Sequence, residues 1–424
     1  MIVRSLKNQA RKLQKTNPQL FRLAQKTYHE LQYCKGVLKS RLMTRQIGGG
    51  GKTKIEVPLA RIKYGNFGAD NQWSLPKDPG FQGIARVKGG DWDLARAELR
   101  EVEMFRLASA YLEKGEEFGD SDIIGAQKVW APANKEKYED ELRKYSAIYE
   151  SIKKDGYKSQ EELGGENPLD EMTVRIGRSG EILFENSFHR FVAANLLGVE
   201  TVPVVVTVRH AKWVQIRNRF HQFAASRVAG RLYGKLLHPD LGDVPHLHEC
   251  DDRVEKIEPH IAKLEKGPAL DIGADLGIFS HMLERAGFEP TAVERDTELA
   301  HYIRLLRDIE GKTFDVITGD IMTDEIQDKV TGKRYALVNA LNIFHHFVKD
   351  EATFKMLVKL LNNLDMEAMV FQAHDTGEEQ MAGGFMNPEP DEFVKLILEH
   401  SCLNHSEHIG TADLDGRQIY MLRK

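Results

Sequence analysis

The chain has 424 residues, of which 41% are hydrophobic and 29% charged, with a formal net charge of −5. This length accommodates two globular domains and an extension. No run of about eighteen apolar residues occurs, and the start MIVRSLKNQARK lacks the apolar core of a secretory signal, which excludes a transmembrane helix and argues for a cytoplasmic protein. Cys34, Cys250 and Cys402 are too few and too far apart for a disulfide framework or a cysteine-rich site, so we expect no metal centre.

Basic residues gather at the start of the chain. Residues 1–46 contain eleven Lys or Arg and one acid, Glu30, and their apolar residues recur at a spacing that predicts amphipathic helices. Such helices suit a basic anchor that binds the inner face of an anionic membrane peripherally, or that binds an acidic partner protein. Alternatively, they pack on the acidic remainder of the chain. The glycines at 48–51 predict a flexible joint. We therefore assign residues 1–51 to a basic helical extension.

Residues 52–212 carry the strand and helix signals of a separate globular domain. In chain order these are the strand IEVPLARI, a glycine-rich loop with Asp91 and Asp93, the helical stretch LARAELREVEMFRLASAYLEKG, the hairpin TVRIGRSGEILFEN, a helix that opens at Phe188, and the strand VPVVVTVRH. Beyond the extension the chain is acidic overall, which argues against nucleic acid as a partner.

The order of these pieces resembles the ParB and sulfiredoxin superfamily. The matching pieces are Ser151-Ile152 with Gly156, the hairpin, the box at 185–190 that ends in His189-Arg190, and LGVETVPV at 197–204. The resemblance implies an α+β domain that binds nucleotide phosphates, and in some members transfers a phosphoryl group, so ATP or another nucleoside triphosphate with Mg²⁺ would be a second cofactor. The free N–H groups of a helix start beside a fixed Arg form an anion site.

Each of these candidate residues has a structural alternative. His189 and Arg190 either grip phosphates or cap the hairpin and pair with an acid. Asp91 and Asp93 either serve a metal or act as a base, or they form the turn that starts the long helix, since Asp is a favoured N-cap. Ser187-Phe188 replaces the glycine that usually precedes the His-Arg pair, which puts a close approach of the backbone to phosphate in doubt.

Residues 213–254 form a basic connector, WVQIRNRFHQF and onward, in which aromatic residues alternate with Arg. This pattern either contacts nucleic acid or, more commonly, packs against the protein. The stretch HPDLGDVPHLHEC holds three histidines and a cysteine without the spacing of a zinc site, and we predict a loop.

Residues 255–424 contain a strand, a glycine loop, a helix and a second strand between positions 269 and 296. Gly273 and Gly277 let the backbone turn tightly, and Glu294, about twenty residues on, ends the second strand where a carboxylate accepts the hydrogen bonds of a ribose diol. Asp275 stands where a phosphate-binding loop keeps its second glycine, and its charge would repel a pyrophosphate. The turn dipeptide Asp415-Gly416 predicts a terminal antiparallel hairpin.

This region resembles the class I S-adenosylmethionine (SAM) methyltransferases. The resemblance implies a Rossmann-like, seven-stranded α/β domain that binds SAM. It places cofactor contacts at the residues of the first strand and its loop, at the end of the second strand, and after the third and fourth strands: Asp271, Gly273, Asp275, Gly277, Glu294, Asp320 and Asn339. Because substrates of open α/β sheets lie beyond the carboxyl ends of the strands, His345, His346 and His374 are candidate bases. For each of them the alternative is a packed or solvent-facing histidine.

The chain therefore predicts a SAM-dependent methyltransferase (EC 2.1.1.-). The Asn-Pro-Pro-aromatic motif of base-amine methylation is absent, which favours a hydroxyl or phosphate on a glycan or small-molecule acceptor. The first function class is a biosynthetic enzyme with a phosphotransferase in the first domain, as in kinase–methyltransferase fusions that cap glycans; residues 342–348 look like the same region of those methyltransferases. The second is a nucleic-acid-associated methyltransferase with a nucleotide-gated clamp. The acidic body favours the first.

Overall fold

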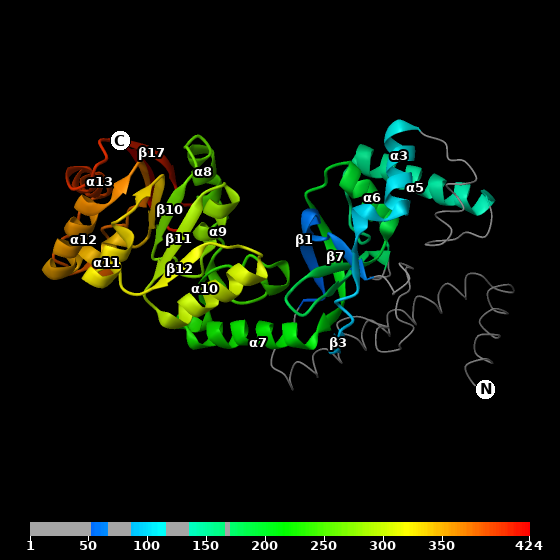
Figure 1. The fold of residues 1–424 in the computed structure, drawn as a ribbon, viewed down its shortest axis with the longest axis horizontal. Coiled ribbons are helices and arrows are strands. Elements are labelled where there is room, and N and C mark those ends of the chain that lie inside the picture. The colour runs from blue at the N-terminus through cyan, green and yellow to red at the C-terminus, as the bar shows by residue number, and fades with distance from the viewer. Residues whose placement is uncertain (1–51, 67–85, 116–134, 166–169) are drawn as a thin grey trace. The chain divides into compact units, whose positions relative to one another are not determined.

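The computed structural model describes residues 52–66, 86–115, 135–165 and 170–424. The predicted basic extension and its glycine joint lie outside these ranges. The chain divides into unit 1, which holds the residues up to Gln222 and Pro239–Asp243, and unit 2, which holds Phe223–His238 and Val244–Lys424 (Figure 1). No helix in the described part of the chain is long and apolar enough to span a membrane.

Unit 1 is an α/β unit with a mixed sheet. Its elements are β1 (Lys54–Pro58), β2 (Tyr64–Asn66), β3 (Arg86–Lys88), β4 (Arg96–Glu98), α3 (Glu103–Lys114), α5 (Lys135–Asp155), β5 (Met172–Ile176), β6 (Ile182–Asn186), α6 (Phe188–Leu196), β7 (Thr201–His210) and α7 (Ala211–Ser226), which continues into unit 2. Within the described residues the sheet has seven strands in the order β1-β7-β5-β6-β2-β4, with β3 also paired to β7.

The predicted hairpin, the helix at Phe188 and the strand after it are confirmed in unit 1. β5 and β6 pair antiparallel, β5 and β7 pair parallel, and α6 begins at Phe188. The rings of Phe184, Phe188 and Phe191 pack together between α6 and the hairpin. The hairpin therefore packs against α6, and α6 in turn packs against α3 and α5.

The long helix predicted directly after Asp93 is wrong in its first part. Arg96–Glu98 is strand β4, which pairs antiparallel with β2, and α3 starts only at Glu103. Asp93 is accordingly no helix cap. Pairing with a strand distant in sequence has overridden the local helical periodicity.

Unit 2 is a doubly wound α/β domain. Its elements are β8 (Leu232–Gly234), β9 (His246–His248), α8 (Asp251–Ile261), β10 (Pro268–Ile272), α9 (Ile278–Arg285), β11 (Glu289–Glu294), α10 (Thr297–Ile309), β12 (Asp315–Thr318), α11 (Asp324–Val330), β13 (Arg334–Tyr335), β14 (Leu337–Leu341), α12 (Glu351–Asn363), β15 (Asp365–Met366), β16 (Ala368–Gln372), α13 (Pro390–Glu399), β17 (His405–Thr411) and β18 (Gln418–Arg423).

Within the described residues its main sheet has seven strands in the order β12-β11-β10-β14-β16-β18-β17. The first five are parallel, and β18 and β17 form an antiparallel hairpin at one side, with Gly416 at φ 68° in its turn. The predicted seven-stranded, Rossmann-like sheet and terminal hairpin are therefore confirmed. The parallel part has the strand order 3-2-1-4-5 of doubly wound folds, which bind ligands beyond the carboxyl ends of the strands.

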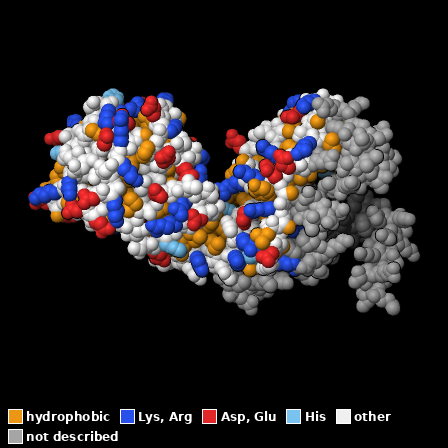
Figure 2. All heavy atoms as spheres, viewed as in Figure 1, with side chains coloured by type: hydrophobic (Ala, Val, Ile, Leu, Met, Phe, Trp, Pro, Cys, Tyr) orange, Lys and Arg blue, Asp and Glu red, His pale blue; other side chains and the backbone are white. Residues whose placement is uncertain are grey.

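Two helical layers cover the sheet of unit 2. One core joins the strands to α11, α12 and α13 through residues such as Ile326, Leu360 and Phe393, and the opposite core joins them to α8 and α9 through Ile257 and Met282 (Figure 1). The strands are apolar on both faces because both faces are buried. On the face drawn in Figure 2, basic and acidic side chains of unit 2 are interspersed, and no field of a single sign forms there.

The predicted connector is shared between the units. The division falls within α7, and Pro239–Asp243 returns to unit 1, where buried Asp240 accepts hydrogen bonds from Arg209 and Trp213. Trp213 is fully buried, so this aromatic side chain packs inside the protein and does not form a nucleic-acid surface. The stretch predicted as a loop also contains β9, which pairs parallel with β8, so that prediction is wrong in part.

Candidate functional site

The glycine loop of unit 2 connects β10 to α9. Gly273 and Gly277 have φ of 73° and 78°, in the left-handed region that glycine adopts without strain. A Cβ on Gly273 would lie 2.8 Å from Cδ1 of Ile343, so the loop has no room for a side chain there. The amides of Gly273 and Ala274 donate to the carbonyl of Val293, which ties the loop to the end of β11.

Asp271 and Asn339 form a buried support beneath this loop. Asp271 is 2% exposed; its Oδ2 accepts from Ser280 Oγ at 2.5 Å and its Oδ1 from Asn339 Nδ2 at 2.7 Å. Ser280 lies in the first turn of α9, so the carboxylate joins the helix start to β10. Asn339 lies inside β14, not after it, and its side chain serves Asp271.

Glu294 ends β11 beside the loop and is 7% exposed. Its Oε2 accepts the amide of Asp275 at 3.0 Å and its Oε1 accepts the amide of Asp296 at 2.9 Å. Burial raises the pKa of Glu294, although the two amides act to lower it. A carboxylate has about four lone-pair sites, so each oxygen keeps roughly one for a further donor.

Asp275 has φ 51°, a conformation that Asp tolerates better than most residues. Its carboxyl group lies against β8, where a Cβ on Gly234 would be 3.8 Å from Oδ2. Burial, reinforced by the charge of Glu294, raises the pKa of Asp275 to about 7. Asp320 follows β12, and its Oδ1 accepts the amide of Met322 at 2.9 Å. These acids therefore lie along one edge of the sheet.

Three histidines follow β14 and β16 at the same edge. The His345 ring centroid lies 4.0 Å from that of His346 and 5.8 Å from that of His374. His345 and His374 are buried, whereas His346 is exposed. Burial, helped by the charges of His346 and Arg417, lowers the pKa of His345 to about 3, so this ring stays neutral.

The tautomer of His374 follows from its neighbour. Asn387 Nδ2 donates to the carbonyl of Thr376, which turns Asn387 Oδ1 toward His374 Nε2 at 2.9 Å. Nε2 must then carry the hydrogen, and Nδ1 is the nitrogen that can accept a proton. Within the described residues, this buried Nδ1 has no hydrogen-bond partner.

A series of side-chain hydrogen bonds that the sequence did not predict lies at the same edge as these histidines. Asn342 Nδ2 donates to the hydroxyl of Tyr233 at 2.8 Å, Arg417 donates to Asn342 Oδ1 at 2.6 Å, and Arg417 pairs with Glu378 at 2.6 Å. Buried Gln372, at the end of β16, has both amide atoms without partners among the described residues. No motif could have revealed this set, because its members come from four separate segments.

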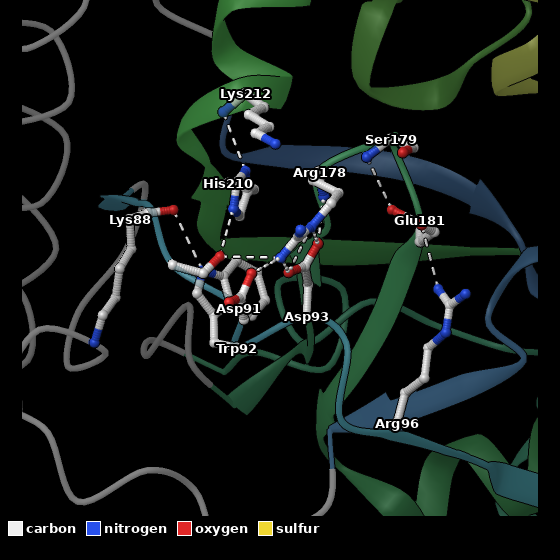
Figure 3. Close-up of polar contacts among 11 residues, drawn as sticks. Lys88, Asp91, Trp92, Asp93, Arg96, Arg178, Ser179, Glu181, His210 and Lys212 are labelled. Atoms are coloured by element: carbon white, nitrogen blue, oxygen red, sulfur yellow. Dashed lines mark hydrogen bonds and ion pairs between the residues drawn. The ribbon is translucent and has the colours of Figure 1, made fainter.

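In unit 1, the glycine-rich loop is held by Arg178 (Figure 3). Arg178 binds both oxygens of Asp93, at 2.8–3.1 Å, as well as Asp91 and the carbonyl of Gly90. Burial acts to raise the pKa of Asp93, but the hydrogen bonds from Arg178 outweigh it and lower the pKa. His210 also contacts the carbonyl of Gly90, at 2.9 Å. The one positive charge of Arg178 therefore offsets one of the two carboxylates, and buried Asp93 is fully paired.

Arg190 and His189 lie elsewhere in unit 1. Arg190, 8% exposed, pairs with Glu171 at 2.5 Å and lies over the ring of Tyr157, and the His189 ring packs 4.3 Å from that of Tyr145. Glu171 precedes β5 and Arg178 follows it, so the two charged clusters lie at opposite ends of a five-residue strand, about 16 Å long. The structure does not bring Asp91 or Asp93 together with Arg190.

Among the described residues, no group of three or more His, Cys, Asp or Glu side chains is arranged to hold a metal ion.

The sequence matches no protein-family model and no curated protein. Part of the chain resembles solved structures of methyltransferases. The bifunctional kinase-methyltransferase WbdD matches with a TM-score of 0.39 and 19% identity, over 48% of this chain and 45% of that chain. The methyltransferase domain of bacterial CtHen1 matches with a TM-score of 0.32 and 16% identity, over 41% of this chain and 98% of that chain.

A SAM-dependent methyltransferase from Clostridium acetobutylicum ATCC 824 matches with a TM-score of 0.33 and 12% identity, over 42% of this chain and 92% of that chain. The chain thus spans less than half of WbdD but nearly all of the two smaller proteins. At these identities and TM-scores the likeness identifies neither substrate nor activity, and the function has to be argued from the geometry of this chain.

Proposed function

We propose that unit 2 is a SAM-dependent methyltransferase whose cofactor lies over the carboxyl ends of β10 and β11. The observation that supports the proposal is the hydrogen bonding of the Glu294 carboxylate. Its buried carboxylate is oriented by two backbone amides beside the glycine loop, and each oxygen keeps a lone pair for one hydroxyl of a ribose diol.

The surrounding residues fit the same cofactor. Gly273, at φ 73° and packed against Ile343, lets the loop turn tightly after β10, and Asp320, after the neighbouring strand, suits the adenine edge. The two acids at 275 and 294 suit a cation and would repel a pyrophosphate. SAM supplies an activated methyl group, so the protein's task is to hold the acceptor in line and to accept a proton.

The acceptor side of the proposal rests on the histidines. His374 Nδ1 is the group that takes the proton from an acceptor hydroxyl, while Asn387 holds the ring in the required tautomer. This supports an oxygen acceptor, a hydroxyl or phosphate of a glycan or small molecule. If the acceptor is a phosphate that is already ionised, no base is required.

We do not propose phosphoryl transfer or a nucleic-acid clamp for unit 1. Arg190 is already bound to Glu171, and Arg178 is already bound to both Asp91 and Asp93. The residues that would have to grip phosphates and hold magnesium lie at opposite ends of β5, whereas phosphoryl transfer needs them around one phosphate.

The test has two stages. Calorimetry should show that the full chain binds SAM and that Gly273→Val, which places a side chain against Ile343, does not. Incubation with isotope-labelled SAM and fractionated cell-surface glycan extracts, read by mass spectrometry, should then reveal a labelled acceptor. If the wild-type chain does not bind SAM, the proposal fails.

A further inference from the structure

Asp275 lies in the proposed cofactor loop, and its carboxyl group has no role in the methyl-transfer step itself. Its backbone amide donates to Glu294 Oε2 at 3.0 Å, and its carboxyl group lies beside Gly234 of β8. A Cβ on Gly234 would lie 3.8 Å from Asp275 Oδ2, so the carboxyl group is enclosed between the loop and β8. Its side chain nevertheless stays partly exposed.

We propose that Asp275 is the residue by which this site prefers cationic SAM to its neutral product, S-adenosylhomocysteine. The proposal rests on the function proposed above. The sulfonium gives SAM a net positive charge, and loss of the methyl group leaves an uncharged thioether. A fixed carboxylate at the cofactor edge therefore attracts the substrate form of the cofactor more strongly than the product form, which favours exchange after each turnover.

The charges that face Asp275 support this role. Glu294 on β11 is a like charge in contact with its amide, and Asp296 beyond it is already paired with Arg227 at 2.9 Å. The neighbouring Cys250 thiol stays protonated, because burial raises its pKa to about 11. Arg227, whose guanidinium also pairs with Glu298 at 3.7 Å, is a cation whose field reaches Asp275, and Arg253 and Lys235 act on the neighbouring Cys250. Asp275 and Glu294 are two adjacent acids at this edge, which suits a cationic ligand.

The protonation of Asp275 should make the preference for SAM over S-adenosylhomocysteine depend on pH. In the empty site, burial and then the charge of Glu294 raise the pKa of Asp275 to about 7, so about half of the molecules are protonated there at neutral pH. A cation favours the ionised form. SAM binding should therefore release a proton to the solvent and strengthen as the pH rises through 7, whereas binding of the neutral product should not.

The experiment measures SAM, S-adenosylhomocysteine and sinefungin by calorimetry on the full chain between pH 6 and 8. Sinefungin carries a protonated amine in place of the sulfonium. We expect the affinities of SAM and sinefungin to rise up to about tenfold over this range and that of S-adenosylhomocysteine to stay level. Buffers of different ionisation enthalpy report the released proton.

Asp275→Asn keeps the shape and tolerates φ 51°. It should weaken SAM and sinefungin about tenfold at pH 8, remove the pH dependence and leave S-adenosylhomocysteine unchanged. The control Glu289→Gln makes the same charge change at the exposed, opposite end of β11 and should alter none of these affinities. Equal losses for SAM and S-adenosylhomocysteine in Asp275→Asn, or a pH dependence that survives it, would overturn the proposal. If the wild-type chain binds none of the three ligands, the methyltransferase function falls first, and this inference with it.

Discussion

Glu294 combines two tasks, since its carboxylate holds the amides of Asp275 and Asp296 and keeps lone pairs for a ligand. We predict that Glu294→Ala weakens SAM binding by about 1–3 kcal/mol, because two ribose hydroxyls lose their acceptor. Glu294→Gln, which keeps one acceptor oxygen, should lose less. Calorimetry measures both, and an unchanged SAM affinity in the alanine variant would reject the ribose assignment.

The ionisation of Asp275 should also affect the stability of the ligand-free protein. Its folded pKa of about 7 exceeds the usual 3.8, so the folded chain binds more protons than the unfolded chain between these values. The contribution of this group to stability is therefore full below about pH 4 and is lost as the pH rises toward 7. Asp275→Asn should accordingly be more stable than wild type at pH 7.5, by up to about 4 kcal/mol, and close to it near pH 4. Denaturant unfolding at both pH values provides the measurement; an advantage that does not vary with pH would contradict the assigned pKa.

His374 and Asn387 form a pair whose roles separate by mutation. His374→Gln should reduce the single-turnover rate of methyl transfer to a hydroxyl acceptor by about a hundredfold or more, with SAM affinity intact, because the proton acceptor is gone. Asn387→Leu should retain part of the rate but shift its pH profile, since the ring loses its fixed tautomer. His405→Gln, an exposed histidine on β17, is the matched control. A rate unaffected by His374→Gln would leave the proton acceptor unassigned.

The sequence predicts the strand, glycine loop and helix after β10 well because their signals are local. Gly273, Gly277 and Glu294 lie within one strand-helix-strand unit, and backbone geometry alone fixes their spacing. Arg417 and Tyr233 were not predictable, since their common partner Asn342 lies 75 and 109 residues away in the chain. Likewise, nothing local indicates that Arg178 satisfies Asp93, 85 residues away.

For helices and strands, too, the sequence predicts the elements that depend on nearby residues and misses those that depend on distant partners. The hairpins β5–β6 and β17–β18 were predicted because a turn dipeptide joins two strands that pair with each other. β4 and β8 were not, because each is a three-residue strand whose partner comes from another part of the chain. Their own residues carry too little periodicity to distinguish a strand from a helix or a loop.

The start of α6 offers a test of what the His-Arg box does. Arg190 and Glu171 are both buried, so Arg190→Ala leaves an uncompensated carboxylate and should destabilise unit 1 by about 3–5 kcal/mol. SAM affinity should not change, because the site lies in unit 2. Arg106→Ala removes an exposed Arg of α3 and should cost less than about 1 kcal/mol. Thermal unfolding compares the variants; an Arg190→Ala protein of wild-type stability that loses a nucleotide-induced shift would restore the phosphate-binding interpretation.

For the whole molecule, the chain divides into two compact units, and the predicted SAM contacts all lie in unit 2, whereas Arg190, the predicted nucleotide contact, lies in unit 1. A ligand that binds only the folded form of one unit stabilises that unit by RT ln(1 + [L]/Kd), about 2.7 kcal/mol at a hundredfold excess over Kd. We therefore predict two calorimetric unfolding transitions, of which SAM raises only one. Arg190→Ala should lower the other and leave the SAM-dependent shift unchanged, which assigns each transition to its unit. A single transition that moves as a whole with both SAM and Arg190→Ala would mean that α7, which runs through both units, couples them into one cooperative block.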